Sequence, residues 1–286
     1  MKPNIDLEDP RVKHIIELHN SQMHKALAAE QRVENSVLPI YHTLKSDTKP
    51  EQIGSGVVVK ISDEYFIFSA SHVFDVIGKF SLLIGLGGGE KLVQFPGERF
   101  STKRGVSGNH RDDPIDASVF HIQDGPTEKL SDIALTIEDL ETDYQDDSKN
   151  VHMAAGFRVK KSNTQGNQAN GKRECFPSVE YGKKEYSILK IDRENQIALA
   201  FENQVLMNGN WQTSPKPTGI SGGAIIKVCG VSMTPPFKSV AEPKQKLVGI
   251  TIEQRREKHR KPGALIGTRI SVHLSLIHKY LPEVLV

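Results

Sequence analysis

The chain has 286 residues, of which 37% are hydrophobic and 25% charged, and its formal net charge is +2. This length and balance allow a sizeable core and exclude a disordered chain. The near-neutral charge gives no reason to expect nucleic acid or a membrane as a partner. We therefore expect one globular unit.

Targeting and redox features are sparse. No apolar run reaches roughly 18 residues, and the first residues are polar and acidic, unlike those of a signal peptide. Cys175 and Cys229 are too few for a disulfide framework, and their spacing matches no zinc motif. We expect a cytoplasmic protein that uses no metal ion or organic cofactor.

The first predicted element is a helix. Asp9 and Pro10 have the residue types of an N-cap and a first helical position, and Ile16, Met23 and Leu27 recur downstream at helical intervals. The pattern predicts a helix of roughly 18 to 22 residues. We assign residues 1–48 to an N-terminal helical extension and residues 49–286 to the main domain. The helix is expected to pack against that domain, to bind a partner or to act as an autoinhibitory arm.

Short apolar runs separated by turn residues follow from Gln52 onward and predict an all-β domain. Near the end of the chain, Leu274, Ile277 and Leu281 keep helical spacing before Pro282 and predict a C-terminal helix. The expected strands include residues 56–61, 65–69, 81–86, 188–191, 197–201, 224–228 and 247–252.

Three residues in the order His72, Asp116 and Ser221 supply the parts of an activated nucleophile. A serine hydroxyl needs a base to accept its proton during attack on a carbonyl, and an imidazole does this near neutral pH. A buried carboxylate holds the imidazole in one tautomer and balances the imidazolium that forms. The glycines around Ser221 favour a sharp bend whose Gly219 and Ser221 amides form an oxyanion hole.

The acidic member has a competitor, because Asp132 is followed by Ile-Ala-Leu and Asp116 by Ala-Ser-Val. Asp116 directly precedes a strand-like run, whereas the segment after Asp132 is acidic and is typical of a loop or helix. We favour Asp116 and interpret Asp132 as a helix N-cap or turn residue.

Taken together, these motifs resemble the chymotrypsin-like (trypsin-fold) serine peptidases over roughly residues 50 to 282. The resemblance rests on Gly-Ser-Gly at 54–56, Ser-Ala-Ser-His at 69–72, Gly-Ile-Ser-Gly-Gly at 219–223 and Leu-Val-Gly-Ile at 247–250. It is closest to standalone intracellular bacterial trypsin-like peptidases. It implies two six-stranded antiparallel β-barrels, with a boundary at about residues 140–150, a cleft site between them and a C-terminal helix.

The resemblance also implies positions that contact the substrate. Pro215 stands six residues before the nucleophile, at the base of the family's specificity pocket, and Thr251, Ile252 and Glu253 follow in the strand that pairs with substrate. Because Pro215 carries no charge, we expect cleavage after an uncharged or small side chain.

Ile220 bears on activation, because secreted zymogens of the family need an acidic residue there to pair with a newly cut N-terminus. We expect control by a protein partner, the N-terminal helix or a loop instead. The expected activity is that of a serine endopeptidase acting on a protein or peptide. The alternative is a catalytically silent interaction module with the same fold.

Overall fold

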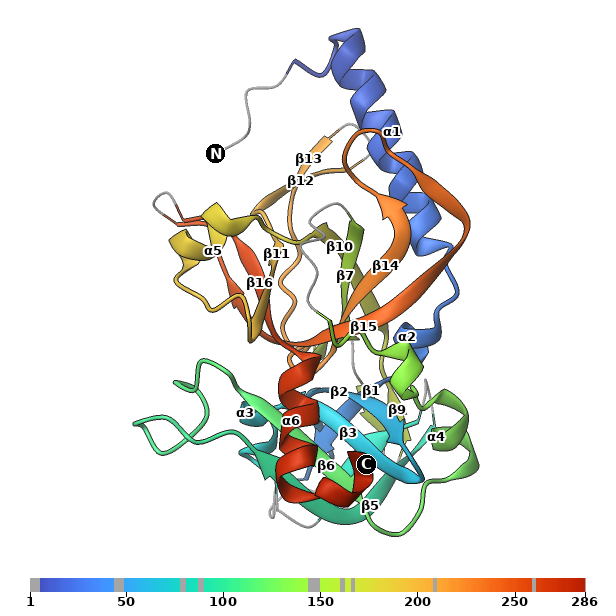
Figure 1. The fold of residues 1–286 in the computed structure, drawn as a ribbon, viewed down its shortest axis with the longest axis vertical. Helices are drawn as coiled ribbons and strands as arrows, with labels where there is room; N and C mark the ends of the chain where they lie inside the picture. Colours follow the sequence, from blue (N-terminus) through green and yellow to red (C-terminus); the bar gives the residue numbers. More distant parts are fainter. Residues whose placement is uncertain are drawn as a thin grey trace.

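The computed structural model describes residues 6–43, 49–77, 81–86, 90–143, 150–159, 163–165, 168–207, 210–258 and 261–285. Two antiparallel sheets lie one above the other, and a helix lies beside each (Figure 1). Among the described residues, no helix is both long enough and apolar enough to cross a membrane.

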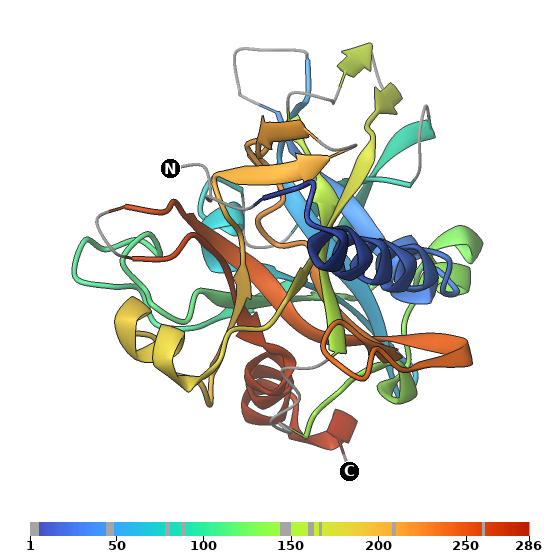
Figure 2. The ribbon, with the colours of Figure 1, turned by 90° about the horizontal axis from the view of Figure 1, so that it is seen from above.

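The N-terminal helix α1 (Pro10–Leu27) begins as predicted. Asp9 is its N-cap and accepts a 2.8 Å hydrogen bond from the backbone N–H of Arg11, which satisfies one of the open donors of the first turn. Gln22 donates to the carbonyl oxygen of Phe237, and Lys25 Nζ lies 2.7 Å from Ser239 Oγ. The helix therefore packs across the second sheet, as Figure 2 shows from above.

The first sheet closes into a six-stranded barrel, because β4 pairs with both β1 and β5. The hairpin of β8 and β9 extends it from β5, and Phe66, Phe68 and Val119 are among the buried residues of this half. The strands are β1 (Val37–His42), β2 (Glu51–Ile61), β3 (Glu64–Ala70), β4 (Ser81–Gly85), β5 (Glu90–Ser101), β6 (Ala117–Ile122), β8 (Asn163–Gln165) and β9 (Gln168–Asn170).

The second sheet has six strands in the order β10-β7-β14-β15-β16-β11. Its edges meet at an isolated bridge between Glu180 and Leu199, so the sheet curls into a second, less fully closed barrel. The strands are β7 (Asn150–Phe157), β10 (Arg173–Val179), β11 (Gln196–Ala200), β14 (Ala224–Ser232), β15 (Ser239–Arg255) and β16 (Ala264–Arg269), and a separate hairpin joins β12 (Gln204–Met207) to β13 (Asn210–Thr213).

Shorter helices connect the strands, and α6 ends the main fold. Helix α6 leaves β16 and packs on β5 and β6 of the first barrel, where Tyr280 stacks on Phe100 with ring centroids 4.9 Å apart. The remaining helices are α2 (Arg32–Asn35), α3 (Ser71–Phe74), α4 (Glu128–Ile133), η1 (Ile137–Asp139), α5 (Lys183–Leu189), α6 (Ile270–Tyr280) and η3 (Pro282–Leu285).

The all-β fold with two barrel-like halves, an N-terminal helix and a C-terminal helix is confirmed. Two details of the prediction were wrong. Strand β1 belongs to the first barrel, so the barrel begins before the expected boundary at residue 49. The strand expected at 188–191 overlaps the end of helix α5, because a short apolar run does not by itself distinguish strand from helix.

Candidate active site

The imidazole of His72 lies against the carboxylate of Asp116. His72 is on the one-turn helix α3 directly after β3, and Asp116 directly precedes β6, the strand paired with β3. The backbone N–H of His72 donates to Asp116 Oδ1 at 2.8 Å, and Nδ1 lies 2.5 Å from Asp116 Oδ2. The carboxylate therefore holds both the backbone and the ring of His72.

Burial differs sharply across this pair. The Asp116 side chain is 7% exposed and that of His72 is 31% exposed. Burial raises the pKa of the Asp116 carboxyl, while the hydrogen bonds and charge of His72 act in the opposite direction. Asp116 also has a φ of 51°, a left-handed conformation that Asp tolerates better than most residues. Its carbonyl oxygen accepts a 3.0 Å bond from the Ser71 N–H, which fixes this turn to α3.

Ser221 lies in the bend between Gly219 and Gly222, whose φ angles are +98° and +82°. Gly222 admits no side chain, since an added Cβ atom would lie 2.0 Å from the carbonyl oxygen of Ser55. Its N–H donates to the Thr251 carbonyl at 2.7 Å, and the Thr251 N–H donates to the Gly223 carbonyl at 2.8 Å. The loop that carries Ser221 is therefore fastened to β15.

The two halves of the candidate site meet at Gly54. A Cβ atom placed there would lie 2.7 Å from the side chain of Val73, the residue after His72, and 3.0 Å from the carbonyl oxygen of Ser221. Within the described residues, the amide N–H groups of Gly219 and Ser221 form no hydrogen bond, so both can donate to a bound group. In the same part of the chain, no hydrogen bond joins His72 Nε2 to Ser221 Oγ.

The competing carboxylate lies elsewhere. Asp132 is exposed in the last turn of α4, where its carbonyl oxygen faces Arg32. In the part of the chain that the structure describes, no hydrogen bond or ion pair joins it to His72. It is neither an N-cap nor a turn residue, because Thr127 caps this helix. Asp116 is thus the acid that the structure brings to His72.

The expected substrate-contacting residues do not all converge. Thr251 and Ile252 are buried on β15, and the Thr251 backbone is bonded to the loop that carries Ser221. Glu253 is exposed and pairs with Arg255 at 2.9 Å. Pro215 is exposed and lines a groove between α1 and the second barrel, together with Ile16 and Phe201.

Ile220 is 2% exposed and belongs to the core of the second barrel. An added Cβ atom on Gly156 would lie 2.8 Å from the Cβ atom of Ile220, so strand β7 passes directly over this residue. An aliphatic side chain in this apolar setting forms no ion pair with a chain terminus.

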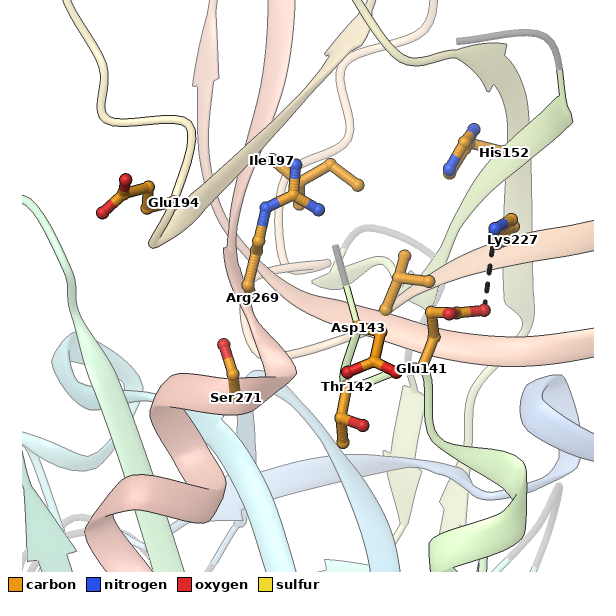
Figure 3. Close-up of a pocket in the computed structure, with 10 residues that line it drawn as sticks. Glu141, Thr142, Asp143, His152, Glu194, Ile197, Lys227, Arg269 and Ser271 are labelled. Carbon is orange, nitrogen blue, oxygen red and sulfur yellow. Dashed lines mark ion pairs between the residues drawn. The ribbon is translucent and has the colours of Figure 1, made fainter. Parts of the chain in front are cut away.

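A separate polar pocket contains none of His72, Asp116 and Ser221. It lies where α6 begins at the second barrel, and Glu141 pairs there with Lys227 at 3.6 Å (Figure 3). Among the described residues, no group of three or more His, Cys, Asp or Glu side chains is arranged to hold a metal ion.

No protein-family model and no curated protein matches this sequence. Among solved structures, the chain is similar to neuropsin, a serine protease expressed in the limbic system of mouse brain. The sequences are 15% identical, and the match covers 87% of this chain and 96% of neuropsin with a TM-score of 0.53. At this identity the likeness shows the fold alone, which is the trypsin-like two-barrel fold.

Proposed function

We propose that this protein is a serine endopeptidase that works through an acyl-enzyme. Ser221 Oγ attacks the peptide carbonyl carbon while His72 Nε2 accepts its proton, and the Gly219 and Ser221 amides hold the oxyanion. His72 then gives the proton to the leaving amine as the C–N bond breaks. Water removes the acyl group by the same steps, and Asp116 orients His72 throughout.

The observation that carries this proposal is the buried Asp116 carboxylate 2.5 Å from His72 Nδ1, beside a glycine bend with two unbonded amide donors. A structural His–carboxylate pair needs no such bend, and a glycine bend alone needs no oriented imidazole. The meeting of Val73 and Ser221 at Gly54 brings both features to one place.

Control by a protein partner, α1 or a loop is part of the proposal. In the described part of the chain, no hydrogen bond joins His72 Nε2 to Ser221 Oγ. Such catalytic hydrogen bonds often form fully only when substrate binds. The buried Ile220 removes the family's ion-pair route to activation. A partner that favours the closed geometry would raise the active population.

Labelling with a fluorophosphonate probe tests the proposal. We expect the wild-type chain to be labelled, and Ser221→Ala and His72→Ala to lose labelling at least about 1,000-fold. Two matched controls should keep the wild-type rate: Ser275→Ala removes an exposed serine of α6, and His121→Ala breaks a His–carboxylate pair, Nε2 to Glu64 Oε2 at 2.7 Å, outside the site. Equal labelling of wild type and Ser221→Ala would contradict the proposal.

A further inference from the structure

Ser55 joins the two barrels at the nucleophile loop. It lies on β2 of the first barrel, fully buried, and its backbone N–H donates to the Ser221 carbonyl at 2.8 Å. Its hydroxyl oxygen accepts a 2.9 Å hydrogen bond from the Phe157 N–H, at the end of β7. The hydroxyl proton points to the carbonyl oxygen of Gly219 at 3.3 Å. One side chain thus contacts both strand β7 and the proposed oxyanion segment.

The donor and acceptor roles of this hydroxyl are fixed by its partners. The Phe157 N–H only donates, so Ser55 Oγ is the acceptor in that bond, and its single proton is free for the Gly219 carbonyl, which only accepts. A hydroxyl is the smallest side-chain group that serves both partners at once. Alanine at this position would serve neither.

The segment that Ser55 contacts is held from a second side. The Val159 N–H donates to the Thr218 carbonyl at 3.2 Å. In a trans peptide the N–H points opposite to the preceding C=O, so this bond directs the Gly219 N–H away from Val159. The Ser55 hydroxyl fixes the next peptide through the Gly219 carbonyl. Two successive peptides are therefore oriented by neighbours outside the loop.

Gly219 requires this support. An added Cβ atom would lie 2.6 Å from the Val159 nitrogen, and the φ of +98° is open to glycine, so no other residue fits. Glycine gives the chain its greatest freedom to rotate its peptides. An oxyanion donor works only if it is oriented before the reaction, so a freely rotating glycine amide loses most of its effect.

We propose that Ser55 is a positioning residue that holds the Gly219 to Ser221 segment in its oxyanion-binding conformation. The inference rests on the proposed serine hydrolase chemistry. Ser55 touches no reacting atom and acts through the Gly219 carbonyl and the Ser221 carbonyl. The group that the positioned amides would stabilise is the oxyanion that develops on the carbonyl oxygen of a carboxylic ester or amide.

The experiment compares Ser55→Ala with the wild-type chain in fluorophosphonate labelling and in hydrolysis of p-nitrophenyl acetate. We expect labelling rate and kcat to fall about 10-fold to 30-fold, less than the loss of an oxyanion donor itself. KM should stay within about twofold, because the oxyanion forms only after the ester has bound. The pH at half-maximal rate should not move, since the pair of His72 and Asp116 is untouched.

Two control variants separate positioning from general damage. Ser118→Ala removes another fully buried hydroxyl, bonded to the Phe100 carbonyl at 3.0 Å within the first barrel. Gln52→Leu removes the neighbouring cross-barrel bond, from Gln52 Nε2 to the Phe157 carbonyl at 2.7 Å, which does not reach Gly219. Both should label within about twofold of wild type.

The outcomes are distinct. If the wild-type chain is labelled and Ser55→Ala is labelled at the same rate, the role of Ser55 is overturned and the proposed function still stands. An equal loss in Gln52→Leu also overturns it, because docking of the barrels would then explain the effect. If the wild-type chain is not labelled, that result by itself overturns both the proposed function and the inference.

Discussion

The carboxylate of Asp116 is buried, and the proposed mechanism needs it to carry a negative charge. Its side chain is 7% exposed, and burial raises its pKa, so the carboxyl accepts a proton more readily in the folded chain than in the unfolded chain. A raised folded-state pKa stabilises the fold at low pH, and this contribution is lost as the pH rises past it. At neutral pH the ionised carboxylate therefore costs folding free energy, and the two bonds from His72 offset part of it.

Asp116→Asn should separate activity from stability. The amide keeps the shape and removes the charge, so the unfolding free energy at pH 7 should stay equal or rise. The fluorophosphonate labelling rate should fall about 1,000-fold to 10,000-fold, because the amide favours the wrong imidazole tautomer. Urea denaturation and labelling kinetics on the same preparation measure both effects.

Asp132→Asn is the matched control for that variant. Asp132 is exposed on α4 and was the competing candidate for the triad acid. The change should leave the labelling rate within about twofold of wild type, as surface changes usually do. A large loss here and none in Asp116→Asn would reverse the assignment of the acid.

Helix α6 places the fully buried imidazole of His273 against the first barrel. His273 stacks on Phe68 with ring centroids 5.3 Å apart, and its Nε2 lies 3.2 Å from the carbonyl oxygen of Ser69. Burial lowers its pKa to about 4, against the weaker opposing effect of backbone carbonyls at Ser69 and Arg269. The helix is therefore docked through a neutral histidine beside the strand that leads to His72.

This histidine predicts a loss of stability in mild acid. The ordinary pKa of a histidine is 6.5, so below that pH the unfolded chain binds a proton that the folded chain does not accept until about pH 4. The free energy of unfolding should fall by about 3 kcal/mol across this interval through His273. His273→Gln keeps a donor for Ser69 and does not titrate, so its urea-denaturation profile should be flatter between pH 6.5 and 4.

His278→Gln provides the comparison on the same helix, because His278 is exposed. Its pH profile should follow that of the wild-type chain. If His273→Gln and wild type lose stability in parallel, the acid sensitivity does not come from the docking of α6.

Elements and site residues differed in how well the sequence predicted them. Helix α1 was found because Asp9 and Pro10 mark its start, and the strand at 224–228 because four of its five residues are apolar. Strand β5 was missed, since Pro96 and Gly97 interrupt its apolar run. His72, Asp116 and Ser221 stand in local motifs, whereas the contact of Ser55 with Gly219 joins residues 164 apart and depends on how the barrels dock.

At the scale of the whole molecule, Glu180 ties the second barrel to α5 and α6. It is 6% exposed and forms the bridge to Leu199 that joins the sheet edges. Its Oε1 accepts 2.7 Å bonds from Tyr186 on α5 and from Arg269 at the start of α6. Helix α6 packs on the first barrel. The Glu180 carboxylate therefore links the closure of the second barrel to the packing of the two barrels against each other.

Glu180→Ala should therefore destabilise the entire fold. Removing the carboxylate leaves the nearly buried Arg269 guanidinium without this charge partner, and we expect a loss of about 3 kcal/mol or more in unfolding free energy. Glu253→Ala is the control, because its 2.9 Å pair with Arg255 is exposed and should contribute less than about 1 kcal/mol. Urea denaturation followed by fluorescence and by circular dichroism should show one coincident, shifted transition for Glu180→Ala. Separate transitions for the two barrels, or a shift no larger than that of Glu253→Ala, would mean that Glu180 does not couple them.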